Sequence, residues 1–122
     1  MVVGGDGSGW VGPGGDNTKV YNNTFVDIPD ASVFGEIILN GSSTEARNNL
    51  FYDTGGTSIT AATVSNTVTP GSDPFVSVAG DDFHLSGAQA GGTLSSPYNE
   101  DLDGVTRGAD GTFDVGALEY EA

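Results

Sequence analysis

An internal repeat constrains the fold of this chain more than any other feature of its sequence. Residues 18–27 recur as residues 44–53, an offset of 26, and five of the ten aligned positions are identical. The identical pairs are Thr18 and Thr44, Asn22 and Asn48, Asn23 and Asn49, Phe25 and Phe51, and Asp27 and Asp53. Periods of roughly 20–50 residues are typical of stacked units rather than of a single globule. Carried on without a gap, the offset places residues 37–40 over residues 63–66 and again pairs asparagine with asparagine.

Each repeat unit is predicted to consist of short β-strands. No window shows a sustained helical period, and Gly, Asn, Thr and Ser interrupt the apolar residues throughout. The strand candidates are residues 20–26 and 34–40 in the first unit, and residues 46–52 and 57–65 in the second. A short helix over residues 44–53 is the alternative, but the β-rich equivalent segment in the first unit argues against it.

A corner is predicted inside each unit, at the paired asparagines. Val20 and Phe25 are five residues apart, so on one straight strand they would face opposite sides. If both are buried, the chain must turn between them, and asparagine tolerates the left-handed backbone that such a turn needs. Identical asparagines in successive units can also hydrogen-bond as a ladder. We therefore predict that Asn23 and Asn49 are structural residues that stack at a corner of a right-handed parallel β-helix.

Three ordered motifs resemble one group of known proteins. The paired asparagines followed by phenylalanine are similar to the repeat of right-handed parallel β-helix proteins of the pectate-lyase-like superfamily. Residues 72–85 resemble the segment "DPLFVD…GDFHL" that ends many such domains, and residues 101–120 resemble their terminal signature "D-DGNPR…DIGAYEY". Residues 87–94 depart from the usual linking segment, which reads like "SPAIDAG".

The resemblance implies the whole architecture. We expect an all-β chain, a right-handed parallel β-helix that forms a single-stranded solenoid of about three or four coils with a C-terminal cap. Residues 1–16 are a Gly-rich N-terminal lead-in, residues 17–122 hold the coils and the cap, and the cap begins near residue 81. The chain is expected to correspond to the C-terminal part of a larger extracellular protein that acts on polysaccharides, although residues 1–3 show no signal-peptide pattern.

The C-terminal region is predicted to be held by one basic residue. Arg107 is the only Lys or Arg after Arg47. The acids near it in sequence are Asp101, Asp103, Asp114 and Glu119. We interpret Arg107 and Asp114 as structural residues of an arginine–carboxylate clamp. Calcium bound by Asp101 and Asp103 is the alternative, and no other cofactor is expected. An EF-hand loop starting at Asp101 fails because its last position is Thr112 rather than glutamate.

The charge balance excludes several classes of partner. Three Lys and Arg residues against seventeen Asp and Glu residues give a net charge of −14. Such a chain has no surface that could neutralise phosphates, so neither nucleic acid nor an anionic membrane is an expected partner. No apolar run is long enough to cross a bilayer. The absence of cysteine excludes disulfides and thiolate chemistry.

A non-catalytic role, structural or associated with carbohydrate, is the favoured interpretation, with a polysaccharide as the expected ligand. Aromatic faces and amide groups on one exposed sheet are enough to bind a sugar. The residues predicted to supply them are Tyr21, Asn22, Asn48 and Tyr52.

The alternative is a small lyase or glycoside hydrolase that acts on acidic polysaccharide. A lyase needs a base and a cation beside the uronate carboxylate. The repeat places Lys19 over Glu45 and Arg47 over Tyr21, so the two bases could approach one another. His84 is interpreted as structural.

Self-association through the N-terminal end is also predicted. The first unit needs a cover over Val20, Phe25 and Ile37, and the preceding segment offers few apolar residues besides Trp10. Uncovered strand edges are normally blunted or paired in natural proteins. We therefore expect either Trp10 to fold back over this end or a second copy to form a homodimer there.

Overall fold

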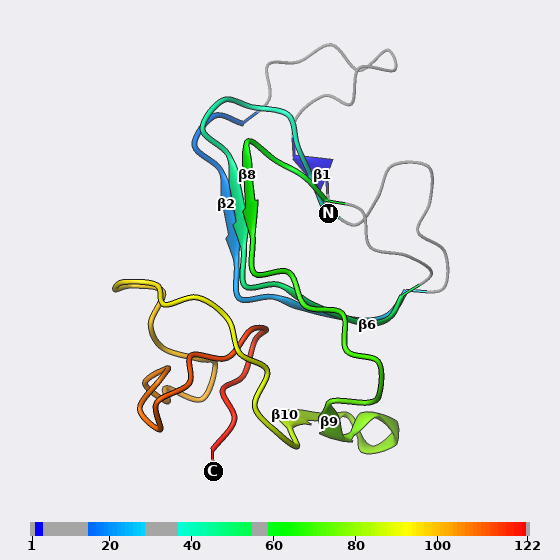
Figure 1. Cartoon of the computed structure of the whole chain (residues 1–122). Coiled ribbons are helices and arrows are strands. Elements are labelled where there is room, and N and C mark those ends of the chain that lie inside the picture. Colours follow the sequence, from blue (N-terminus) through cyan, green and yellow to red (C-terminus); the bar gives the residue numbers. More distant parts are fainter. Residues whose placement is uncertain (1, 4–14, 29–36, 55–58, 122) are drawn as a thin grey trace.

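The chain is built from short strands that are joined by turns (Figure 1). The computed structural model describes residues 2–3, 15–28, 37–54 and 59–121. The strands are β1 (Val2–Val3), β2 (Lys19–Tyr21), β3 (Thr24–Ile28), β4 (Ile37–Leu39), β5 (Glu45–Arg47), β6 (Leu50–Thr54), β7 (Ile59–Thr60), β8 (Thr63–Ser65), β9 (Phe75–Ser77) and β10 (Asp82–Leu85). The described residues contain one short 3-10 helix, Val78–Gly80, and no α-helix. The predicted all-β class is therefore confirmed.

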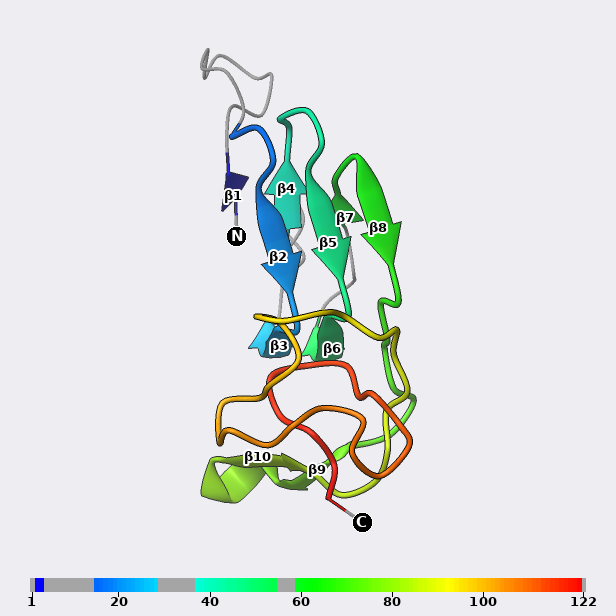
Figure 2. The same ribbon diagram turned by 90° about the vertical axis from the view of Figure 1, so that its left-hand side faces the viewer.

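Strands β1 to β8 form three small parallel sheets, which the chain visits in the same order on each pass. The sheets are β1–β4–β7, β2–β5–β8 and β3–β6, and Figure 2 shows β2, β5 and β8 side by side. Lys19 pairs with Glu45 and Phe25 with Phe51, which keeps the predicted offset of 26. A corner divides the candidate at residues 20–26 into β2 and β3, and the one at residues 46–52 into β5 and β6. The candidate at residues 57–65 is also wrong as a single strand, because it spans β7 and β8, which belong to different sheets.

The prediction that the offset of 26 continues without a gap beyond the repeat is wrong. Ile37 pairs with Ile59, 22 residues later, and Glu45 pairs with Thr63, 18 residues later. Residues 37–40 therefore do not lie over residues 63–66. Each pass of the chain through the three sheets is shorter than the one before it, because its connections contain fewer residues, whereas the strands stay in register with one another.

The corners carry left-handed backbone at equivalent places of successive passes. Asn22, Asn48 and Asn66 have φ of 55°, 55° and 52° and follow the paired strands β2, β5 and β8. Asp27 and Asp53 have φ of 52° and 51° and sit at equivalent places in β3 and β6. Asparagine and aspartate adopt this conformation at lower cost than most residues. The predicted corner between Val20 and Phe25 is confirmed.

The predicted asparagine ladder is present at the same corner. The side-chain Nδ2 and the backbone N–H of Asn23 both donate to Oδ1 of Asn49, each at 3.1 Å. Nδ2 of Asn49 donates in turn to the carbonyl oxygen of Val20 at 2.9 Å. Asn49 is fully buried, and these bonds satisfy its amide where water cannot reach.

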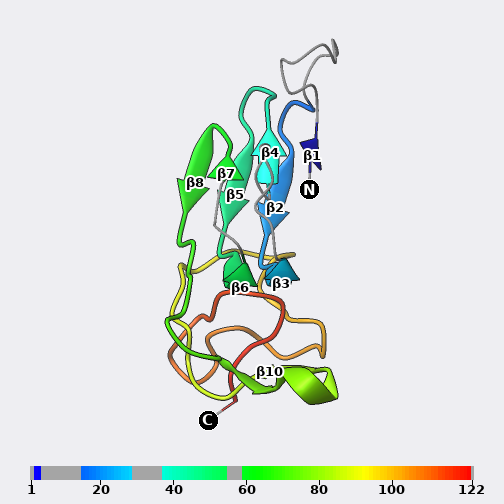
Figure 3. The same cartoon turned by 90° about the vertical axis from the view of Figure 1, so that its right-hand side faces the viewer.

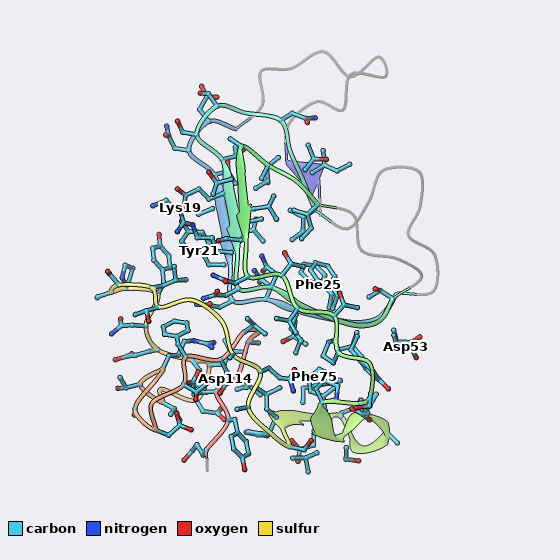
Figure 4. All side chains as sticks on the ribbon, viewed as in Figure 1. Lys19, Tyr21, Phe25, Asp53, Phe75 and Asp114 are labelled. Atoms are coloured by element: carbon cyan, nitrogen blue, oxygen red, sulfur yellow. The ribbon has the colours of Figure 1, made fainter. Side chains whose placement is uncertain are left out.

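Two apolar clusters hold the molecule together. The first lies between the three parallel sheets and contains Val20, Ile37, Leu39, Ala46 and Phe51. The second lies between the outer side of β3–β6 and the C-terminal region and contains Leu50, Phe75, Leu85 and Val115. Phe25 is partly buried and packs against the first cluster, and Phe75 belongs to the second; both are labelled in Figure 4. The antiparallel pair β9–β10 contributes Phe75 and Leu85 to the second cluster.

The C-terminal region packs beside the parallel sheets, not over their last strand. Val64, in β8, is 44% exposed, and Figure 3 shows β8 at the outer end, above the C-terminal region. The expected cover over the final strand is therefore missing among the described residues. At the opposite end Val20 is 4% exposed, Ile37 is fully buried, and β1 pairs with β4. Self-association through this end stays a prediction. Trp10 and most of the predicted lead-in lie outside the described residues.

Candidate functional site

Four polar side chains project from the outer face of β2 and β5. Alternation along each strand turns Val20 and Ala46 into the core, so that the residues on either side of them face outward. Lys19 pairs with Glu45, and Tyr21 pairs with Arg47. The predicted juxtaposition of these residues is confirmed, and Figure 4 shows Lys19 and Tyr21 on the outer side of the sheet.

Glu45 joins the neighbouring polar groups. The Tyr21 hydroxyl donates a hydrogen bond to Oε2 of Glu45, and Nε of Arg47 lies 3.1 Å from the same oxygen. The bond from Tyr21 is the main reason why the pKa of Glu45 lies below its usual value. Burial, followed by the bond to Glu45, raises the pKa of Tyr21 to about 12. At neutral pH the phenol is therefore neutral and the carboxylate is ionised.

Tyr98 reaches this face from the C-terminal region. Its ring meets the ring of Tyr21 edge to face, with centroids 4.9 Å apart and planes at 79°. Nζ of Lys19 lies 5.9 Å from the Tyr21 centroid and 5.7 Å from the Tyr98 centroid, within cation–π range. Nδ2 of Asn22 donates to the carbonyl oxygen of Tyr98 at 3.0 Å. We call Lys19, Tyr21, Glu45, Arg47 and Tyr98 the tyrosine cluster.

An open pocket of about 290 Å³ lies at the tyrosine cluster. Its lining residues are Thr18, Lys19, Val20, Tyr21, Asn23 and Tyr98. Tyr98 was missed by the sequence analysis because it lies outside the repeat and far from Tyr21 in sequence. No sequence pattern links the two tyrosines.

The four residues predicted to bind sugar do not come together. Tyr21 and Asn22 lie at the tyrosine cluster. Asn48 is fully buried. Its Nδ2 donates to the carbonyl oxygen of Gly92 at 2.6 Å, and its Oδ1 accepts from the Gly92 N–H at 3.0 Å. Tyr52 lies beyond the corner, on β6, where its ring contacts Phe75 with centroids 6.0 Å apart. Asn48 therefore holds the C-terminal region, and Tyr52 belongs to the second apolar cluster.

Arg107 is buried at the centre of the C-terminal region. Its Nη1 lies 3.4 Å from Oε2 of Glu119, and its guanidinium donates to the carbonyl oxygens of four residues. These residues are Glu100, Asp114, Gly116 and Ala117. Of the acids expected around Arg107, only Glu119 forms an ion pair with it among the described residues. Burial raises the pKa of Glu119 and outweighs the opposing effects of its hydrogen bonds and of Arg107.

The other acids of this region accept backbone hydrogen bonds. Asp114 is fully buried, and its carboxylate accepts from the N–H groups of Gln89 and Tyr120. Asp101 accepts from the N–H groups of Asp103, Val105 and Glu119 at 2.8–3.0 Å. Within the described ranges, no group of three or more His, Cys, Asp or Glu side chains is arranged to hold a metal ion.

His84 bridges two carboxylates on the surface. Its Nδ1 lies 2.6 Å from Oδ1 of Asp82, and its Nε2 lies 2.8 Å from Oδ2 of Asp103. The contact with Asp82, followed by that with Asp103, raises the pKa of His84 above its ordinary value of 6.5. His84 therefore ties β10 to the turn that follows Asp101.

We expect a pH titration of the His84 imidazole by NMR to give a pKa above 6.5. Because the folded-state pKa is raised, the charged imidazole stabilises the fold fully below that value, and this contribution is lost as pH rises through the folded-state pKa. Asp103→Asn should move the pKa back down. Asp81→Asn is the matched control, since Asp81 already has left-handed backbone at φ 56°, which asparagine accepts. An unchanged pKa in Asp103→Asn would contradict the bridge.

No family model, curated protein or solved structure matches the chain. In the part of the chain that the structure describes, no helix is long and apolar enough to cross a membrane. The side-chain geometry of the tyrosine cluster is therefore the basis for a functional proposal.

Proposed function

We propose that this chain is a non-catalytic, carbohydrate-associated module that binds a saccharide at the tyrosine cluster. The observation that carries this proposal is the pair of tyrosine rings beside Lys19, Glu45 and Arg47 on one outer sheet face. Tyrosine combines a flat apolar face with a polar hydroxyl, which suits the alternating C–H and O–H groups of a sugar ring. The neighbouring charged groups add hydrogen-bond donors and acceptors that can fix its orientation.

The distribution of basic residues supports the same location. The chain has three Lys and Arg residues in total. Arg107 is buried, forms an ion pair with Glu119 and donates to backbone carbonyl oxygens. Lys19 and Arg47 are the other two, and both lie in the tyrosine cluster. A ligand that approaches this acidic protein meets the accessible Lys and Arg side chains at this place.

The ionisation state of Glu45 favours binding over catalysis. A general acid needs a carboxyl group whose pKa is raised towards neutrality. Glu45 has the opposite shift, because it accepts a hydrogen bond from Tyr21 and lies beside Arg47. The alternative function, a lyase or hydrolase of acidic polysaccharide, would use the same face and is separated by the experiment below.

We also propose that the three parallel sheets are the faces of a right-handed parallel β-helix of the pectate-lyase-like superfamily, in which each pass of the chain is one coil, and that the chain belongs to a larger extracellular protein. The repeated order in which the chain visits the sheets supports this assignment, as do the asparagine corners and the Asn23–Asn49 bond. The C-terminal motifs support it independently, because they are distinct in sequence from the repeat.

Calorimetry with neutral and acidic oligosaccharides tests the binding proposal. We expect Tyr98→Ala to weaken binding roughly tenfold, which is the effect of losing one aromatic contact. Tyr98→Phe keeps the ring and loses only the hydroxyl, so it should bind more tightly than Tyr98→Ala. Wild-type protein that binds none of the saccharides, or Tyr98→Ala that binds as well as the wild type, would contradict the proposal. Release of unsaturated products or new reducing ends during the same incubation would favour the enzymatic alternative.

A further inference from the structure

The last strand of the parallel stack leaves its inward side chain in solvent. Val64 occupies the same register position as Ala46 and Val20, its partners in β5 and β2. Val20 is 4% exposed and Ala46 is fully buried, but Val64 is 44% exposed. The column of apolar side chains that forms the first cluster thus ends in solvent at β8.

The backbone of β8 is unpaired on the same side. One edge of β8 pairs with β5, and among the described residues no strand pairs with its other edge. Figures 2 and 3 show β8 at the outer end of the stack from two directions. Natural proteins protect such edges with lysine, proline, a bulge or a covering segment, because an open edge accepts a strand from another chain. Thr63, Val64 and Ser65 supply neither charge nor proline.

The sequence around this edge lacks charge altogether. Residues 54–72 contain no acidic or basic side chain, although the chain carries a net charge of −14. Two copies of such a protein repel one another wherever their acidic surfaces meet. An uncharged edge is the place at which two copies can approach without that repulsion, whereas a basic partner would gain nothing there. The charge pattern therefore selects a second copy of this chain as the occupant.

We propose that the free edge of β8 is a self-association surface, at which β8 strands from two copies pair antiparallel about a two-fold axis. Such an interface is closed, because the same surface contributes from both sides and both open edges are consumed. With β8 three residues long, its central residue Val64 faces Val64 of the other copy. This surface lies at the end of the stack opposite to the one predicted from the sequence.

Sedimentation velocity over a range of protein concentrations tests the proposal with the full chain. We expect the wild type to form a dimer as concentration rises, and Val64→Lys to raise the dissociation constant at least about tenfold, because two like charges would oppose each other. Val76→Lys is the matched control, since Val76 is an exposed valine on β9, with 57% exposure. It should dimerise like the wild type.

A mixing experiment tests the two-fold geometry and guards against misfolding of a single variant. Val64→Lys and Val64→Glu should each be monomeric alone and should form a dimer when mixed, because opposite charges then meet across the axis. A strictly monomeric wild type would overturn the proposal. So would equal effects of Val64→Lys and Val76→Lys, failure of the mixture to dimerise, or growth of the wild type into species larger than a dimer.

Discussion

Arg107→Ala is expected to lower the free energy of unfolding by about 3–5 kcal/mol, as found when one partner of a buried ion pair is removed. The side chain of Arg107 is 1% exposed and that of Glu119 is 3% exposed, so water cannot replace the lost guanidinium. The carboxylate would stay buried without its counter-charge, and four backbone carbonyl oxygens would lose a donor. Urea denaturation followed by circular dichroism measures the change.

Arg47→Ala is the matched control for this prediction. Arg47 also lies beside a glutamate, at 3.1 Å from Glu45, but its side chain is 36% exposed. Exposed ion pairs contribute about 0–1 kcal/mol, so this variant should unfold close to the wild type. We propose that the clamp, rather than bound calcium, holds the C-terminal region, so a chelator should leave the melting temperature of the wild type unchanged. Similar losses in the two arginine variants, or destabilisation by the chelator, would contradict the assignment.

Phe51→Ala is expected to cost about 3–5 kcal/mol of stability, the usual range for removing a buried aromatic ring. Phe51 is fully buried, and its ring stacks on that of Phe25 with centroids 4.6 Å apart and planes at 2°. The substitution therefore opens a cavity in the first apolar cluster and also removes the stacked contact.

Phe25→Ala is the comparison for Phe51. Phe25 is only partly buried, whereas β6, which carries Phe51, lies between β3 and the segment at Val68, whose carbonyl oxygen accepts from the Phe51 N–H at 2.9 Å. Its loss should therefore cost clearly less than that of Phe51, and urea midpoints of the two variants give the order directly. A larger loss of stability for Phe25→Ala than for Phe51→Ala would mean that β6 is not the interior strand.

The repeat predicted the parts of the fold that depend on local residue chemistry. Asn22 and Asn48 take the left-handed conformation at corners, and Phe25 stacks on Phe51, because identical residues at a fixed offset face identical surroundings. The outward pairing of Lys19 with Glu45 followed from the same offset. These features require only that equivalent strands lie side by side.

The sequence could not predict features that depend on chain segments outside the repeat. Tyr98 meets Tyr21 only because the C-terminal region folds back along the corner, where Asn48 binds Gly92. The same docking buries Asn48, which had been assigned to sugar binding, and leaves Val64 uncovered. The shorter second pass also escaped prediction, because the spacing of strands depends on connections that carry no repeated residues.

The unequal spacing of the parallel strands has a consequence for how such a protein can change. Partners lie 36, 26, 22 or 18 residues apart, yet the asparagine corners after β2, β5 and β8 keep nearly the same φ. The length of the chain between strands is thus independent of the register of the strands themselves, and lengthening a surface connection costs little in closure entropy. The connection from β4 to β5 has five residues, 40–44, and the equivalent connection from β7 to β8 has two, 61–62, yet β8 stays in register with β5. These two junctions are where evolution or a protein engineer could graft new loops while the neighbouring sheet face stays intact.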